Sequence, residues 1–185
     1  MIVRGNKTYF DREDVLNIKQ EDLPLIVLSR NYYSHFATEI SVFDHTLWNH
    51  FMWMVHPGKF ATQGVAFHEV PADQYLDGTY QLKFWSSKSW SAQSRILLQK
   101  QIEKELAEPW WKHRYDVLQI LGIKLHLRML QISWMQICSD WAEYIRTLDD
   151  EFRENSHRTP GEVDRWCLNQ SHRGYDVFGR YYPLD

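Results

Sequence analysis

The chain has 185 residues and a formal net charge of −3 with its histidines neutral. A hydrophobic fraction of 44% and a charged fraction of 24% are typical of one globular domain, residues 1–185, and exclude a disordered chain. The charge gives no basic footprint for nucleic acid, and no apolar run is long enough to span a membrane. The N-terminus lacks the apolar core of a signal peptide, which predicts a protein made in the cytoplasm.

The first half of the chain predicts strands. Residues 1–22 are polar and mixed in charge, which favours an irregular N-terminal arm with a short helix near residues 12–18. Apolar and aromatic runs predict strands at residues 23–29, 48–55, 59–63, 65–70 and 79–85. Because residues 56–58 have the Pro-Gly composition of a turn, we expect residues 48–85 to form an antiparallel meander.

The second half of the chain predicts helices. Apolar residues recur at helical spacing over residues 89–106, 115–130 and 138–148. Thr159 followed by Pro160 is typical of a helix start, and that short helix should end near Leu168. The tail, residues 174–183, has the aromatic composition of a strand. Strands followed by helices indicate an α+β protein rather than an alternating α/β protein.

Cys138 is one of two cysteines and lies where an amphipathic helix is expected to begin. Helix N–H groups and the helix dipole stabilise a thiolate in that position. Ser133 and Gln136 match a capping box, which would start the helix earlier and place Cys138 in its second turn. A catalytic Cys138 requires the later start, near Ile137, and we adopt it. The alternatives are an inert buried thiol and, less favoured, a disulfide with Cys167.

His50 is the candidate base for this thiol. It lies within an apolar strand, whose rigid backbone would position the imidazole. Alternation places it on one face with Met52 and Met54. A third residue would orient the imidazole through its other nitrogen, and the strand at residues 65–70 offers His68 and Glu69 for this role. We assign it to Glu69, whose carboxylate would stabilise an imidazolium, with Gln63 as the fallback. The alternative is a core histidine with a satisfied hydrogen bond.

Other chemistries have less support in the sequence. The chain has no His-Glu-x-x-His, Cys-x-x-Cys, Asp-rich calcium loop or Gly-rich phosphate loop, so we expect neither a metal nor a cofactor. A cysteine-first arrangement would need His157 or His172 as its base, and both lie in polar, charged surroundings. A serine triad could be assembled only from residues that no pattern specifies, namely Ser34, His35 and Glu39.

Several segments resemble motifs of the circularly permuted NlpC-like, papain-like cysteine hydrolases. Residues 48–55 resemble the family's "Ser-His-Val-Gly-Ile" strand, residues 115–122 its "Tyr-Asp-Tyr…Gly" helix entry, and residues 137–140 its "Cys-Ser-Glu" nucleophile motif. Residues 159–161 resemble a "Thr-Pro" segment that often follows. The histidine precedes the cysteine, which is the permuted order. The resemblance covers about residues 23–165, and it departs from the family at Asn49, where Ser is usual, and at Asp140, where Glu is usual.

The resemblance implies a permuted papain-like fold, an antiparallel sheet packed against helices that include the nucleophile helix. It implies a hydrolase in which the Cys138 thiolate attacks an amide or ester carbonyl and His50 protonates the leaving group. The substrate would be a peptide, a peptidoglycan fragment or an acyl compound. The alternative, favoured by the high aromatic fraction of 15%, is a catalytically silent papain-fold module that binds a partner or builds a particle. Either would suit a phage or bacterial accessory protein, and the sequence leaves the oligomeric state open.

Overall fold

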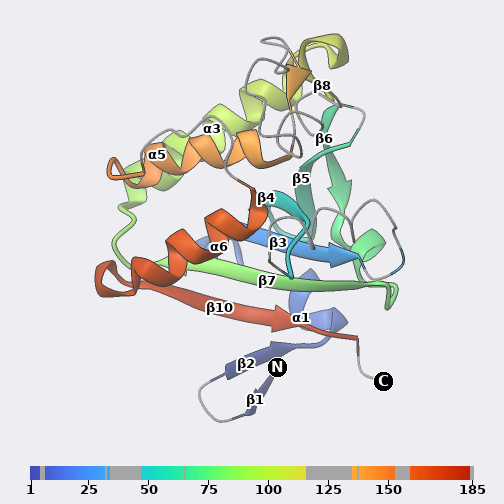
Figure 1. The fold of residues 1–185 in the computed structure, drawn as a ribbon, viewed down its shortest axis with the longest axis vertical. Coiled ribbons are helices and arrows are strands. Elements are labelled where there is room, and N and C mark those ends of the chain that lie inside the picture. The colour runs from blue at the N-terminus through green and yellow to red at the C-terminus, as the bar shows by residue number, and fades with distance from the viewer. Residues whose placement is uncertain are drawn as a thin grey trace.

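An open eight-stranded sheet forms the centre of the computed structural model (Figure 1). The strand order is β1-β2-β10-β7-β3-β4-β5-β6, and every neighbouring pair is antiparallel except β2 with β10. The strands are β1 (Ile2–Arg4), β2 (Lys7–Phe10), β3 (Leu25–Asn31), β4 (His50–His56), β5 (Lys59–Gln63), β6 (Phe67–Pro71), β7 (Tyr80–Ser87) and β10 (Tyr175–Tyr181). The structure describes residues 1–4, 7–31, 33, 47–64, 66–115, 135–136, 138–152 and 159–183.

Helices pack on both faces of this sheet. The α-helices are α1 (Arg12–Leu16), α3 (Ala92–Ala107), α5 (Ile145–Leu148) and α6 (Pro160–Asn169). The 3-10 helices are η1 (Gln20–Asp22), η2 (Ala72–Tyr75), η3 (Trp110–His113), η5 (Cys138–Tyr144) and η6 (Ser171–Arg173). A short parallel pair, β8 (Arg114–Tyr115) and β9 (Met135–Gln136), forms a separate small sheet. No helix in the described ranges combines the length and the apolar character that a membrane span requires.

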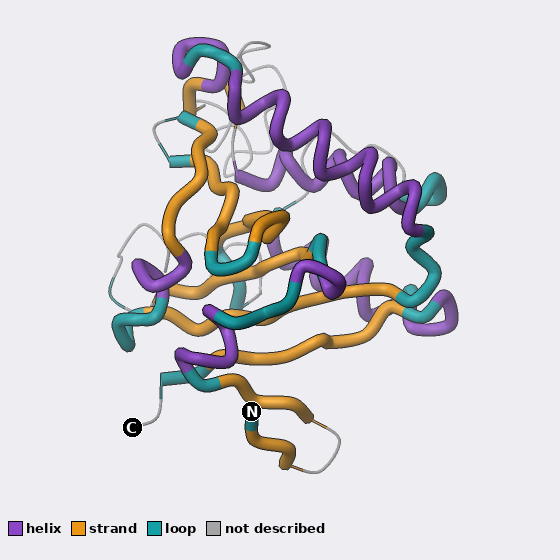
Figure 2. The backbone as a smooth tube through the Cα atoms, turned by 180° about the vertical axis from the view of Figure 1, so that it is seen from behind, coloured by secondary structure: helices purple, strands orange, loops and turns teal. Residues whose placement is uncertain are grey.

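The two faces of the sheet bury two separate cores. One core packs α3, α5, α6 and η5 against the sheet, and α3 lies beside α5 (Figure 1). The other core packs α1 and η2 against the opposite face, which Figure 2 shows from behind. Within β4, Phe51 and Trp53 belong to the first core and Met52 and Met54 to the second. The sheet is therefore the middle layer of three, as its alternating buried side chains require.

The α+β class predicted from the sequence is confirmed, and several elements match closely. The strand predicted at residues 59–63 is β5, and the helix predicted after Thr159 is α6. Thr159 Oγ1 accepts from the backbone N–H of Glu162, whose carboxylate accepts from the N–H of Thr159, which completes a capping box. The helix predicted over residues 115–130 lies almost wholly outside the described residues.

Two predictions about the sheet are wrong. Residues 1–22 are not an irregular arm, because β1 and β2 form a hairpin that extends the sheet beside β10. Residues 48–85 form a meander only as far as β6, because β7 leaves that edge and pairs with β3 and β10 instead. The pairings of β2 with β10 and of β7 with β3 and β10 join segments that are distant in sequence, which local composition does not encode.

Candidate functional site

Cys138 is the first residue of η5, and residue 137 separates it from the end of β9. The helical segment therefore begins where a catalytic Cys138 requires it, although its first two turns are 3-10 rather than α. Ser133, the earlier candidate start, lies outside the described residues. The Cys138 thiol is buried with only 5% of the residue exposed, and Cys138 and Cys167 are both free thiols.

His50 is the first residue of β4 and bonds a side chain that the sequence reading missed. Its Nε2 lies 2.6 Å from Oγ1 of Thr62 on the neighbouring strand β5. Burial lowers the pKa of His50 to about 4, so the imidazole is neutral at pH 7. In the tautomer with the proton on Nε2, the ring donates to Thr62, and the Nδ1 lone pair is then able to accept a proton.

Tyr75 on η2 extends this contact through a hydrogen bond with Thr62. Burial raises the pKa of the Tyr75 phenol, a side-chain hydrogen bond with Thr62 lowers it, and negative charges on Tyr80 and Cys138 raise it. The phenol is therefore bonded to Thr62, and its pKa would respond to the charge of a Cys138 thiolate. His50, Thr62 and Tyr75 form one polar chain, which we call the His50 chain. The body of η5 packs on the other face of β4, in the core that holds Phe51 and Trp53.

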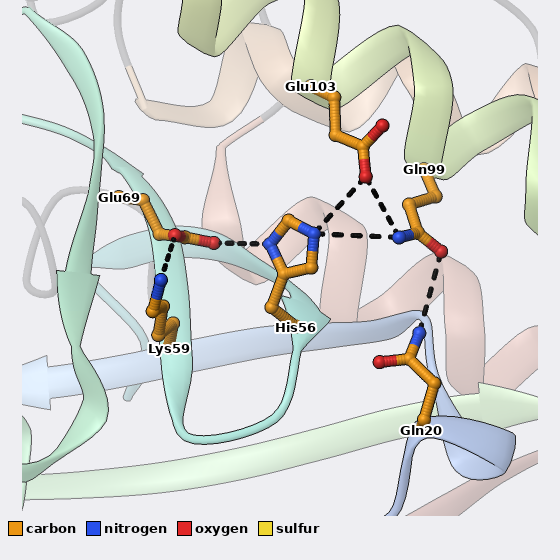
Figure 3. A network of polar contacts seen from close by, with 6 residues as sticks. All are labelled: Gln20, His56, Lys59, Glu69, Gln99 and Glu103. Carbon is orange, nitrogen blue, oxygen red and sulfur yellow. Dashed lines mark hydrogen bonds and ion pairs between the residues drawn. The ribbon is translucent and has the colours of Figure 1, made fainter.

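Glu69 bonds a different histidine from the one expected. Its Oε1 lies 2.5 Å from Nδ1 of His56, and its Oε2 accepts from Lys59 Nζ at 3.0 Å (Figure 3). The fallback Gln63 is also engaged elsewhere, since its Nε2 donates to the carbonyl of His113 at 2.7 Å and its Oε1 accepts from Trp141 Nε1 at 2.9 Å. Thr62, rather than Glu69 or Gln63, is the residue that contacts the His50 imidazole.

A β-bulge explains why Glu69 meets His56. In a regular two-residue hairpin with His56 opposite Lys59, Met54 would pair with Ala61, and Ala61 pairs with Glu69, so His50 and Glu69 would share a face. The structure instead pairs Trp53 with Ala61, because the register shifts by one residue between Trp53 and His56. This shift moves Glu69 to the other face of the sheet from His50. It pairs Thr62 with Met52, so Thr62 lies on the same face as His50.

The start of β4 is held by a partly buried carboxylate from α6. Asp164 Oδ1 accepts from Lys83 Nζ at 2.6 Å and from Trp85 Nε1 at 2.7 Å, and Oδ2 accepts from Trp48 Nε1 at 3.1 Å. The ammonium of Lys83 also lies over the rings of Trp85 and Trp48, 4.6 and 5.7 Å from their centroids. Asp164 thus fixes the side chain of Trp48, which lies two residues before His50 in the sequence.

Asn49, where the resembled family has Ser, has a structural role at the same point. It is buried, its N–H donates to the carbonyl of Ser29 at 3.1 Å, and its Oδ1 accepts from the N–H of Asn31 at 3.4 Å. The side chain therefore fastens the start of β4 to the end of β3.

Of the remaining candidate bases and serine-triad residues, only His172 lies within the described residues. His172 is exposed on η6 with Nδ1 3.2 Å from the carbonyl of Asn169. His157, Asp116 and the serine-triad candidates Ser34, His35 and Glu39 lie outside the described residues. Where the structure describes side chains, no cluster of three or more His, Cys, Asp or Glu residues is arranged to hold a metal ion.

The fold and this site define an α+β protein with an open, mostly antiparallel sheet and a histidine at the start of a central strand. No protein-family model and no curated protein matches the chain.

Proposed function

We propose that the protein is a cysteine hydrolase with Cys138 as its nucleophile and His50 as its general base and acid. The observation that carries the proposal is the His50 chain, which joins a neutral imidazole through Thr62 to the Tyr75 phenol, and the pKa of that phenol responds to the charge of Cys138. A nucleophile, a base and a residue that orients the base are the parts that thiol hydrolysis needs.

The reaction proceeds in two halves. His50 takes the thiol proton of Cys138, and the thiolate attacks the carbonyl carbon of an amide or ester. The tetrahedral intermediate collapses, the imidazolium gives its proton to the leaving amine or alcohol, and a thioester remains on Cys138. Water then attacks the thioester and passes a proton to His50, so the acid leaves and the thiol is restored. Thr62 holds the ring through Nε2 in both halves.

The arrangement of layers is consistent with a permuted papain-like fold, in which a sheet strand supplies the histidine and a helical segment supplies the cysteine. The segment that starts at Cys138 packs against β4, where Trp53 Nε1 donates to the carbonyl of Trp141 at 2.9 Å. We propose that the substrate is a peptide, a peptidoglycan fragment or an acyl ester.

Hydrolysis of peptidoglycan peptides and of a small acyl ester tests the proposal. Cys138→Ala and His50→Gln should each reduce kcat/KM at least about a hundredfold, because each removes a group that acts in the transition state. His68→Gln is the matched control, since His68 lies on neighbouring β6 and its Nδ1 lies 2.8 Å from the nearby carbonyl oxygen of Ala66. Activity that survives both catalytic substitutions would contradict the proposal.

A second candidate function is binding without catalysis. Trp110 and Trp111 on η3 are 56% and 55% exposed and lie nearly perpendicular, with ring centroids 6.2 Å apart. Exposed aromatic pairs of this kind can stack on sugars or pack against peptides. Under this alternative, Trp110→Ala with Trp111→Ala weakens sedimentation with peptidoglycan at least tenfold, whereas Cys138→Ala has no effect on it.

A further inference from the structure

His56 stands between two carboxylates that come from different layers of the molecule. Its Nδ1 lies 2.5 Å from Glu69 Oε1 on β6, and its Nε2 lies 3.2 Å from Glu103 Oε1 on α3 (Figure 3). A neutral imidazole carries one N–H and can donate to one carboxylate only, whereas an imidazolium donates to both. The geometry is therefore that of a protonated histidine.

The charges around His56 favour its protonation. Lys59 on β5 binds Glu69 at 3.0 Å, and Gln99 on α3 donates from Nε2 to Glu103 Oε1 at 2.9 Å. Gln99 Nε2 also lies 3.5 Å from His56 Nε2, and its Oε1 accepts from Gln20 Nε2 of η1 at 3.5 Å (Figure 3). The two carboxylates face one ammonium, so this group carries an excess of negative charge that a protonated His56 neutralises.

The pKa shifts agree with this geometry. Burial lowers the pKa of His56, but the hydrogen bonds and charges of Glu69 and Glu103 outweigh it and raise the pKa above its usual value. Because the pKa is raised, the stabilisation from the doubly bonded imidazolium is fully present below about pH 6.5. It is lost as the pH rises through the pKa of His56 in the folded protein. Burial alone would raise the pKa of Glu69. The hydrogen bonds and charges of His56 and Lys59 outweigh burial and lower this pKa below its usual value, so the carboxylate stays charged to a lower pH.

The contact links the two parts of the molecule that carry His50 and Cys138. On the sheet side, His56 ends the strand that begins with His50. On the helix side, α3 holds the segment that starts at Cys138, because Tyr144 Oη donates to Glu105 at 2.8 Å and Thr147 Oγ1 donates to Gln101 at 2.5 Å. We propose that His56 is a pH-operated latch: its protonation ties α3, with the segment it holds, to the β4–β5 hairpin, and its deprotonation breaks this tie and loosens α3 around Gln99 and Glu103. The latch does not depend on the proposed hydrolysis.

Hydrogen exchange on the full chain without substrate tests the latch, together with an NMR titration of the His56 ring. We expect His56 to titrate above pH 6.5. After correction for intrinsic rates, we expect amides of α3 around residues 99–103 to exchange about tenfold faster at pH 8.5 than at pH 6. His56→Gln should remove this pH dependence, and His68→Gln on β6 should keep it.

A His56 titration at or below pH 6.5 would overturn the latch, as would equal pH dependence in the wild type and in His56→Gln. If His56→Gln does not fold, Glu103→Gln supplies the second variant, because it removes one carboxylate and should lower the titration midpoint of His56. None of these readouts involves substrate. Failure of the latch is therefore distinct from failure of the hydrolase proposal, which the Cys138 and His50 variants decide.

Discussion

At the scale of single residues, burial sets the behaviour of His50, and neighbouring charges set that of His56. Burial with one hydroxyl contact lowers the pKa of His50 to about 4, whereas two carboxylates raise the pKa of His56 despite its burial. The surroundings of the same side chain at the two ends of β4 thus favour the neutral form in one place and the protonated form in the other. Neither role follows from residue type alone.

The low pKa of His50 predicts an acid-side loss of stability. The unfolded chain takes up the proton at a pKa of about 6.5 and the folded protein only near 4, so stability present above pH 6.5 is lost as the pH falls. The loss in the free energy of unfolding amounts to roughly 3 kcal/mol at pH 4. Urea unfolding of wild type and His50→Gln between pH 4 and 7 measures it. If the unfolding free energies of the wild type and of His50→Gln changed in parallel with pH, the lowered pKa of His50 would be contradicted.

At the scale of elements, the sequence is informative where local chemistry decides. β5 has its predicted bounds because a Pro-Gly turn precedes it and Gly64 follows it. The partner of His50 could not be predicted, because a one-residue bulge between Trp53 and His56 exchanges Glu69 for Thr62 on its face. The β1–β2 hairpin was missed because its residues are mostly exposed and show no buried face.

The contact between β2 and β10 gives a prediction at the same scale. A Cβ at Gly179 would lie 2.1 Å from Phe10 Cε2, and the Phe10 ring is confined by Phe84 and Phe178 at centroid distances of 5.7 and 5.8 Å. Gly179→Ala should therefore cost about 2–3 kcal/mol of unfolding free energy.

Urea unfolding of the wild type, Gly179→Ala, Phe10→Leu and the double variant measures this cost. The double variant should be less destabilised than the sum of the two single variants, because a smaller side chain at residue 10 makes room for the new methyl group. Strict additivity would show that the ring of Phe10 does not limit residue 179.

At the scale of the whole molecule, the sheet separates two cores and carries a polar group of opposite protonation at each end of β4. The class of the fold followed from the order of strands and helices in the sequence. The strand order did not, because β7 and the N-terminal hairpin pair with strands far away along the chain. The candidate pair Cys138 and His50 came from motif order, while Thr62 and Tyr75 required the packing of β5 and η2.

The most direct measurement of the central proposal is mass spectrometry of the intact protein after rapid mixing with an activated acyl ester. The account predicts one acyl group on Cys138, formed at pH 7 and cleared with time, no adduct on Cys167, and a much slower reaction in His50→Gln. Acylation of Cys138 at the same rate in His50→Gln, or no acylation of Cys138 at all, would contradict it.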